Sequence, residues 1–417
     1  MRFLLFLLFP AALHAQIYAD FTVSSGGSPL GTFRVLLEHE KAPRTCANFI
    51  GLASGKRPWI DVTNGAVRTN TPYYDGLTFH RLIHSFVIQG GSPNGQGNDG
   101  PGYTILDEYH PDLRHSSDYV LSMAKSAFPN TGGSQFFITL RATPELNDKY
   151  SVFGRVISGT AIIDGFKNPA LFPTGVGDKP VTPIIMDSVV ISGPSYAGFD
   201  LNAASHQLPE IDTTVFTPVR NAGTGDFKIV FPRRARTDYL FYQSVDLTSW
   251  DGAGTLLSYD AAPSLDYSFG VVAAPRFFVN GATVRYDLIP DSHPDLSSAQ
   301  KTIRILEPDG SRMEMKLSSP QGTWKRLNPG GTTVASGLLV DFLWTDVSAT
   351  AGFVNPATSQ SFRVPLGELQ VIFDAPVAPG NSTYLGTWLS FHTPNAGWLE
   401  ETQGNTEYRR PFEILSN

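Results

Sequence analysis

Residues 79 to 91 read FHRLIHSFVIQGG, and they carry the clearest structural signal in this chain. The apolar, β-branched and aromatic residues of the stretch predict a largely buried strand: Leu82, Ile83, Phe86, Val87 and Ile88. Arg81 and Gln89 interrupt this pattern, and two glycines end it. A guanidinium and an amide inside such a strand need partners. The stretch therefore raises the question of what Arg81 and Gln89 face.

The composition of the chain indicates its fold class and excludes some classes of partner. The chain has 417 residues, which is enough for two or three domains of ~100–200 residues each. Its 39 glycines and 31 prolines favour mostly β structure with many turns over long helices. The formal net charge is −7, and Lys and Arg form no long tract along the chain. We therefore expect neither nucleic acid nor an anionic membrane as a partner.

The N-terminus has the pattern of a secretory signal peptide, MRFLLFLLFPAALHAQ. One arginine precedes an apolar run, and small residues lead to a predicted cleavage site after Ala15. The run is too short to span a membrane comfortably. We therefore expect a secreted or periplasmic protein. Its one cysteine, Cys46, can form no internal disulfide.

One short helix is predicted over residues 42–55, APRTCANFIGLASG. Its apolar residues recur at helical spacing: Cys46, Phe49, Ile50 and Ala53. Pro43 suits the first turn and Gly55 suits the end. Cys46 is accordingly interpreted as a core residue, not a reactive thiol.

Short strands follow one another through residue 195: the segments 31–40, 73–83, 118–126, 134–140, 150–159 and 183–193. Such a series predicts a closed barrel or a sandwich, with the helix that begins at Pro43 capping one end.

Several motifs fail on their context. Residues 95–100, GQGNDG, have the spacing of a dinucleotide-binding loop, but Pro101 and Gly102 follow and no helix begins there. His80 and His84 are four residues apart on a predicted strand, with no cysteine or carboxylate at a ligand spacing. The sequence contains no G-x-S-x-G motif. We therefore expect no metal, nucleotide or other cofactor.

Three separated segments share a pattern: FHRLI…FVIQGG from Phe79, LSMA…PNTGGSQFFI from Leu121, and VFGRV from Val152. In this order they resemble the cyclophilin family, and the resemblance covers about residues 17–192. It implies a mainly β fold: an eight-stranded antiparallel barrel capped by two helices. It also implies a peptidyl-prolyl cis–trans isomerase whose site lies on an outer face of that barrel.

Elementary chemistry shows what such a site needs. Rotation about an X–Pro bond breaks amide resonance, which is a barrier of ~18–20 kcal/mol. Neither proton transfer nor a covalent intermediate is required. A catalyst needs an apolar slot for the proline ring and a donor that binds the twisted amide better than either planar form. The guanidinium of Arg81 is always charged and holds its N–H groups in a fixed fork, which suits that donor.

The resemblance assigns the remaining roles. Arg81 would lie over the prolyl nitrogen, with Gln89 orienting it and Gln135 nearby. Four residues would form the slot: Phe86, Val87, Phe137 and Leu146. The backbone of Ala124 and Lys125 would bind the residues before proline, with Tyr150 at the edge. From the residues alone, Arg81 could instead be a surface arginine, and Phe86 and Phe137 could be ordinary core.

The chain departs from the most familiar family pattern at several positions. Glu145 stands where many members have Trp, Tyr150 where many have His, and Lys125 where many have Asn. Val87 replaces a common Met. Loss of the Trp predicts weak binding of cyclosporin-type inhibitors. The segment 55–74 resembles longer bacterial forms and is expected to line one edge of the groove.

Beyond about residue 195 the chain remains all-β. We predict a cyclophilin-like domain over residues 16–195, a small β module over 196–281 and a C-terminal β domain over 282–417, with sandwich-like packing. Within the last, residues 302–319 predict a hairpin around the turn Pro308–Gly310. This half shows no catalytic constellation, and its ligand is unknown. We expect residues 16–195 to fold and to isomerise on their own.

Two functions follow. The first is an isomerase that acts on proline-containing segments of exported proteins. The second is a non-catalytic module that binds proline-containing peptides, with a C-terminal extension for adhesion to a surface or partner. Arg81, Phe86, Gln89 and Phe137 favour the enzyme, while Glu145 and Lys125 favour the binding module.

Overall fold

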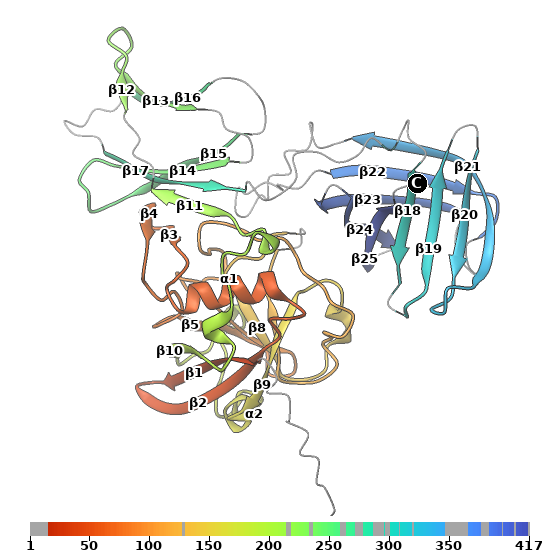
Figure 1. Ribbon diagram of the computed structural model, residues 1–417. Helices are drawn as coiled ribbons and strands as arrows, with labels where there is room; N and C mark the ends of the chain where they lie inside the picture. The colour runs from red at the N-terminus through yellow and green to blue at the C-terminus, as the bar shows by residue number, and fades with distance from the viewer. Residues whose placement is uncertain are drawn as a thin grey trace, which may run out of the picture.

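The computed structural model describes residues 16–126, 130–213, 218–232, 237–258, 264–271, 278–286, 296, 301–307, 309–318, 321–346, 366–376, 383–393, 395–403 and 406–415. The predicted signal peptide, residues 1–15, lies outside these residues. The described chain forms three β-rich parts: a first barrel, a small two-sheet module and a second barrel (Figure 1).

The first barrel confirms the eight-stranded prediction. Its neighbouring strands pair antiparallel and close in the order β1-β10-β5-β6-β8-β7-β9-β2. The strands are β1 (Ile17–Ser25), β2 (Ser28–Leu37), β5 (Thr78–Leu82), β6 (Val87–Gly90), β7 (Val120–Met123), β8 (Phe136–Thr139), β9 (Val152–Ser158) and β10 (Ile184–Ser192). Residues 79–91 form the hairpin β5–β6 and not one strand, because the N–H of Phe86 bonds back to the carbonyl of Ile83.

Aromatic rings fill the first barrel. Phe21 stacks on Phe33 with ring centroids 4.8 Å apart, and Phe49 and Phe136 meet edge to face at 5.8 Å. Phe49 comes from the helix α1 (Pro43–Ala53), which confirms the predicted helix and packs its apolar face on the barrel. Cys46 on that face is fully buried, and burial raises the pKa of its thiol. The second helix, α2 (Thr160–Phe166), buries Ile163 and Phe166.

The small module consists of two sheets, ordered β11-β17-β14-β15 and β12-β13-β16. Its strands are β11 (Glu210–Thr213), β12 (Val219–Arg220), β13 (Asp226–Pro232), β14 (Thr237–Ser244), β15 (Asp251–Ser258), β16 (Ser264–Val271) and β17 (Phe278–Arg285). The first sheet lies over α1 and over the hairpin of β3 (Trp59–Asp61) and β4 (Ala66–Arg68) (Figure 1). Ile211, Leu240 and Val284 belong to the same buried cluster as the core of the first barrel. Apolar packing therefore continues from the barrel into the module.

The C-terminal part has its own core and closes into a second eight-stranded barrel, in strand order β18 to β25. Its strands are β18 (Lys301–Leu306), β19 (Arg312–Leu317), β20 (Gly322–Leu327), β21 (Thr333–Asp346), β22 (Leu366–Phe373), β23 (Tyr384–Thr393), β24 (Ala396–Gln403) and β25 (Thr406–Leu415). The predicted hairpin is β18–β19, in which Ile303 pairs with Met315. The all-β prediction is thus confirmed, with a closed barrel as the final unit. Among the described residues, no helix combines the length and the apolar character needed to cross a membrane.

Candidate active site

Arg81 and Gln89 are direct partners across the β5–β6 hairpin. The pairing shifts its register between Phe79 and Arg81, which places His80 in a β-bulge. A bulge re-aims the side chains of the strand that carries it. The Arg81 side chain is 39% exposed and Gln89 is half-buried, so both reach the outer face of the barrel while Phe79 and Ile88 pack inside.

Arg81 forms an ion pair with Asp178. Its Nε lies 3.3 Å from Oδ2 of Asp178, whose side chain is 47% exposed. Asp178 ends a short 3₁₀ turn (Val176–Asp178), and both Gly177 and Asp178 have positive φ angles, 71° and 60°. An ion pair this exposed contributes about 0–1 kcal/mol, so the guanidinium can exchange it for a ligand.

An apolar cluster separate from the barrel core, which we call the slot, includes Phe137, the register partner of Gln89 on β8, and Gln89 in turn pairs with Arg81. Val87, Ala124 and Phe137 form its buried part, and Phe86, Leu146 and Tyr150 pack against them from its partly exposed side. Phe137 and Tyr150 meet edge to face, with ring centroids 5.6 Å apart. The fold therefore brings six of the predicted site residues together, although they come from four separate segments of the chain. An apolar cluster that is half open to solvent suits a compact apolar ligand group.

His115 supports the slot from behind. It is fully buried, and its ring stacks on Phe137 at 5.8 Å. Its Nε2 lies 3.0 Å from Oγ of Ser122 and its Nδ1 lies 3.2 Å from Oδ1 of Asn147. Burial lowers the pKa of His115 to about 4, so the ring is neutral near pH 7. Sequence reasoning missed this residue, because an isolated histidine without a motif carries no local signal.

Gln89 and Gln135 form a hydrogen-bonded pair next to the slot. Nε2 of Gln89 donates a hydrogen bond of 2.9 Å to Oε1 of Gln135, and Nε2 of Gln135 donates one of 2.8 Å to the carbonyl of Asp99. The N–H of Ala124 donates to the carbonyl of Gln135 at 2.8 Å. The two predicted glutamines are therefore held in a fixed relation to the segment after β7 that carries Ala124 and Lys125.

An open groove of about 470 Å³ begins at this pair. Gln89, Ala124, Lys125 and Gln135 line the end that is next to the slot, and Val62 of the 55–74 segment lines another edge. Nζ of Lys125 sits 5.4 Å from the centre of the Tyr150 ring, so Lys125 borders both slot and groove.

Glu145, one of the positions that depart from the family pattern, lies at the rim of the slot. Glu145 forms an ion pair with Arg141, with Nη2 and Oε1 2.9 Å apart, and both side chains are half-exposed. The guanidinium of Arg141 in turn lies 5.7 Å from the centre of the Phe86 ring. A charged pair therefore borders the slot where many family members carry an indole.

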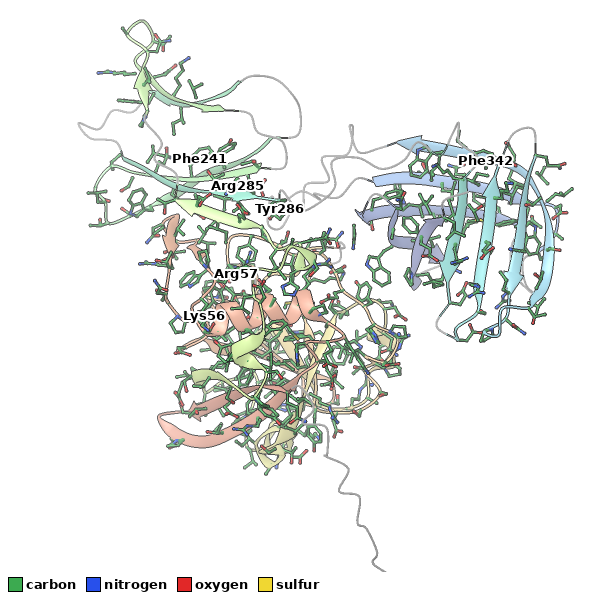
Figure 2. The ribbon with its side chains drawn as sticks, in the orientation of Figure 1. Lys56, Arg57, Phe241, Arg285, Tyr286 and Phe342 are labelled. Carbon is green, nitrogen blue, oxygen red and sulfur yellow. The ribbon has the colours of Figure 1, made fainter. Side chains whose placement is uncertain are left out.

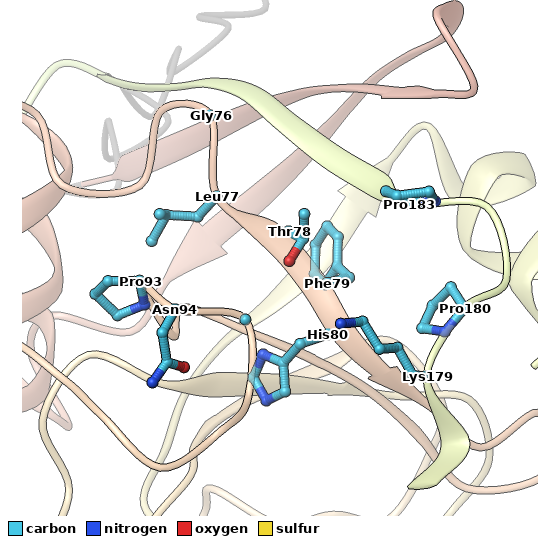
Figure 3. A pocket seen from close by; sticks show the side chains of 11 residues that line it. Gly76, Leu77, Thr78, Phe79, His80, Pro93, Asn94, Lys179, Pro180 and Pro183 are labelled. Carbon is cyan, nitrogen blue, oxygen red and sulfur yellow. The ribbon is translucent and has the colours of Figure 1, made fainter. Parts of the chain in front are cut away.

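A second, smaller cavity of about 250 Å³ lies beside β5, and His80 reaches into it beside Asn94 and Lys179 (Figure 3). Burial, with the nearby charges of Arg81 and Lys179, lowers the pKa of His80 to about 4. Nδ1 of His84 lies instead 2.8 Å from the carbonyl of Phe166. Over the part of the chain that the structure describes, no group of three or more His, Cys, Asp or Glu side chains is placed to hold a metal ion. The loop at residues 95–100 leads into a bend and not into a helix.

Comparison with known proteins identifies relatives of the part of the chain that forms the first barrel. The family described as cyclophilin type peptidyl-prolyl cis-trans isomerase/CLD matches residues 18–191. Peptidyl-prolyl cis-trans isomerase A of Mycobacterium tuberculosis is 42% identical over 164 residues, which are 39% of this chain and 87% of the relative. Peptidyl-prolyl cis-trans isomerase B of Streptomyces anulatus is 40% identical over 179 residues, 42% of this chain and 97% of the relative. A Cryptosporidium parvum cyclophilin type isomerase, crystallised in the presence of the dipeptide Ala-Pro, is 31% identical and covers 42% of this chain and 99% of its own, with a TM-score of 0.36.

Proposed function

This chain belongs to the cyclophilin-type peptidyl-prolyl cis-trans isomerases, and from that premise we propose that it accelerates X–Pro rotation in exported polypeptides, with Arg81 as its catalytic residue. One observation carries the assignment of the site. A partly exposed guanidinium stands beside an apolar slot that is distinct from the barrel core. This pairing of donor and slot matches what rotation about a prolyl bond demands.

The slot would bind the proline ring through Phe86, Phe137 and Leu146. With the ring held, twisting the X–Pro bond removes conjugation and places a lone pair on the prolyl nitrogen. A donor aimed at that nitrogen binds the twisted state better than either planar state, and only such differential binding speeds the reaction. Arg81 supplies the donor without any change in its protonation, because a guanidinium stays charged.

The residues before proline would lie toward the groove. Because the N–H of Ala124 is bonded to Gln135, Ala124 would contact a peptide backbone through its carbonyl. Gln89 is held by Gln135 and faces Arg81 across the hairpin, so it would limit the directions in which the guanidinium points. A fixed donor loses little entropy when the substrate binds.

The proposed location rests on the apolar N-terminal run that ends near Ala15. The sequence-based division into a catalytic domain, a small module and a C-terminal domain likewise stays a proposal. We keep a second function as an alternative, because Glu145 and Lys125 at the rim of the slot depart from the family pattern. It is a non-catalytic module that binds proline-containing peptides, with the C-terminal part holding a partner or a surface.

A protease-coupled proline-peptide assay on the purified chain tests the proposal. Arg81→Ala should lower kcat/KM by at least about tenfold, or ~1.4 kcal/mol of transition-state stabilisation. Arg155→Ala is the matched control, because Arg155 is 61% exposed and its nearest acidic partner is Glu38 at 3.8 Å. A chelator should leave the rate unchanged. An Arg81→Ala chain that is folded and as fast as wild type contradicts the assigned role, and a wild-type chain that binds proline peptides without isomerising them favours the second function.

A further inference from the structure

The groove next to the slot has one wall that does not come from the first barrel. Every second residue along one stretch of β14 lines this wall: Asp238, Leu240 and Tyr242. Alternate residues of a strand point to the same face of a sheet, so β14 turns this face toward the barrel. The residue between Leu240 and Tyr242, Phe241, is fully buried and labelled on this strand in Figure 2.

Direct contacts hold this wall in place. The Nη2 of Arg57 donates to the carbonyl of Pro209, and its Nε donates to the hydroxyl of Tyr103 at 2.9 Å. The N–H of Thr104 donates to the hydroxyl of Tyr286 at 3.3 Å. Tyr103 and Thr104 line the groove themselves, so the bonds that dock the module also fix residues of the groove that come from the first barrel. Figure 2 shows Arg57 and Tyr286 at this junction.

Close packing reinforces the junction. The ring of Tyr242 lies so near Gly65, in the turn between β3 and β4, that a Cβ at residue 65 would overlap it. Gly65 also has a φ of +73°, which glycine adopts without strain. Burial raises the pKa of Tyr242 to about 12, with a contribution from Asp61, so its hydroxyl stays protonated. Tyr242 is thus a fixed, neutral wall residue.

The position of this wall relative to the slot follows from peptide geometry. Side chains of an extended peptide alternate in direction, and each residue advances the chain by about 3.3 Å. When proline occupies the slot, the side chain two residues earlier points to the same side and lies roughly 6–7 Å away. Ala124, Gln89 and Gln135 join slot and groove at that boundary. The groove is therefore the place for that side chain.

We propose that strand β14 of the appended module is a specificity wall of the isomerase site, which selects a bulky side chain two residues before proline. The proposal rests on the proposed function. Tyr242 and Val62 are partly exposed and offer apolar surface to the groove, and the buried residues Leu240, Pro101 and Tyr103 complete this part of the lining. A volume of about 470 Å³ accepts a large side chain, and Asp238, only 3% exposed, gives the wall a polar end. A small side chain at this substrate position would not fill the groove, and water would occupy the remaining space.

A tetrapeptide series that differs only at this position, with Gly, Ala, Leu or Phe two residues before proline, tests the proposal on the full-length chain. In wild type, kcat/KM should rise with side-chain size. Tyr242→Ala should lower the Phe-to-Gly ratio of kcat/KM by about fivefold or more, through KM and not kcat. Tyr384→Ala is the matched control, because Tyr384 lies in the second barrel and is 50% exposed. The control should keep the wild-type ratio.

Two further experiments cover the case in which Tyr242→Ala does not fold and the case in which the chain shows no activity. If Tyr242→Ala does not fold, Tyr242→Trp narrows the groove instead and should also lower the Phe-to-Gly ratio. If wild type turns over no peptide, the proposed function fails, and calorimetric binding of the same four peptides still tests the wall. A folded Tyr242→Ala chain with the wild-type ratio, or with wild-type relative affinities, overturns the proposal.

Discussion

The Nε of Arg81 lies 3.3 Å from the carboxylate of Asp178, a residue on a turn that is far from the β5–β6 hairpin in sequence. The pair places a compensating negative charge beside the proposed catalytic donor. Because both side chains are about half-exposed, water screens the attraction and the pair restrains Arg81 only weakly.

Replacing Asp178 should therefore have a small effect with a definite sign. Asp178→Asn keeps the size of the side chain and removes its charge, so the guanidinium no longer shares its charge with a carboxylate. We expect kcat/KM on a short proline peptide to rise by about two- to threefold or less. A fall of tenfold would mean that Asp178 positions Arg81, and not that it competes for it.

The slot should be needed for binding more than for folding. Phe86 is only partly buried at its edge, so Phe86→Ala should raise KM by about tenfold with a modest loss of melting temperature. Phe172→Ala is a matched control, because Phe172 is also partly buried but packs on Phe166, with ring centroids 4.9 Å apart. Equal KM values for the two variants would show that Phe86 does not contribute to substrate binding.

Stability should fall in acid between about pH 6.5 and about pH 4, because burial lowers the pKa of both His80 and His115 from 6.5 to about 4. Across that window the unfolded chain binds more protons than the folded one, so stability rises with pH and is lost as pH falls. Urea midpoints measured from about pH 7.5 to about pH 4 test this. His115→Phe should shrink the change with pH, whereas His110→Phe, on a partly exposed loop, should not.

Truncation after Tyr196 tests the division of the chain. All residues proposed for Arg81's site and for the slot lie before this point, so the fragment should still isomerise a short peptide. It should melt at a lower temperature than the full chain, because Ile211, Leu240 and Val284 no longer cover apolar surface of the first barrel. It should also lose the preference for a bulky side chain two residues before proline. An insoluble fragment, or a folded inactive one, would show that the module completes the catalytic domain.

Much of the first barrel could be predicted from the sequence. Strand periodicity located β2, β7, β8, β9 and β10, and the spacing from Cys46 to Ala53 located α1, because each element buries one face and so repeats at its own period. The predicted slot residues also come together in one cluster. That grouping came from the family pattern and not from spacing, since Phe86 and Tyr150 are distant in sequence.

Other features left no local trace. The break of residues 79–91 into two strands depends on a turn bond between Ile83 and Phe86. The stack of His115 on Phe137 and the pairing of Asp178 with Arg81 depend on how separate loops return to the sheet. Such contacts carry no periodicity, because each involves a single residue from a segment of its own.

Local pattern and family likeness together determined the barrel, its capping helix, and the presence of a donor beside an apolar slot. Only the tertiary structure decided that Asp238, Leu240 and Tyr242 would form a wall of the groove beside Lys125. In the sequence, β14 is one strand of a separate module, and the period of a strand says which residues share a face but not what that face will meet. Three contacts across the junction set what this face meets: Arg57 donates to the carbonyl of Pro209, the N–H of Thr104 donates to the hydroxyl of Tyr286, and Gly65 leaves room for the ring of Tyr242.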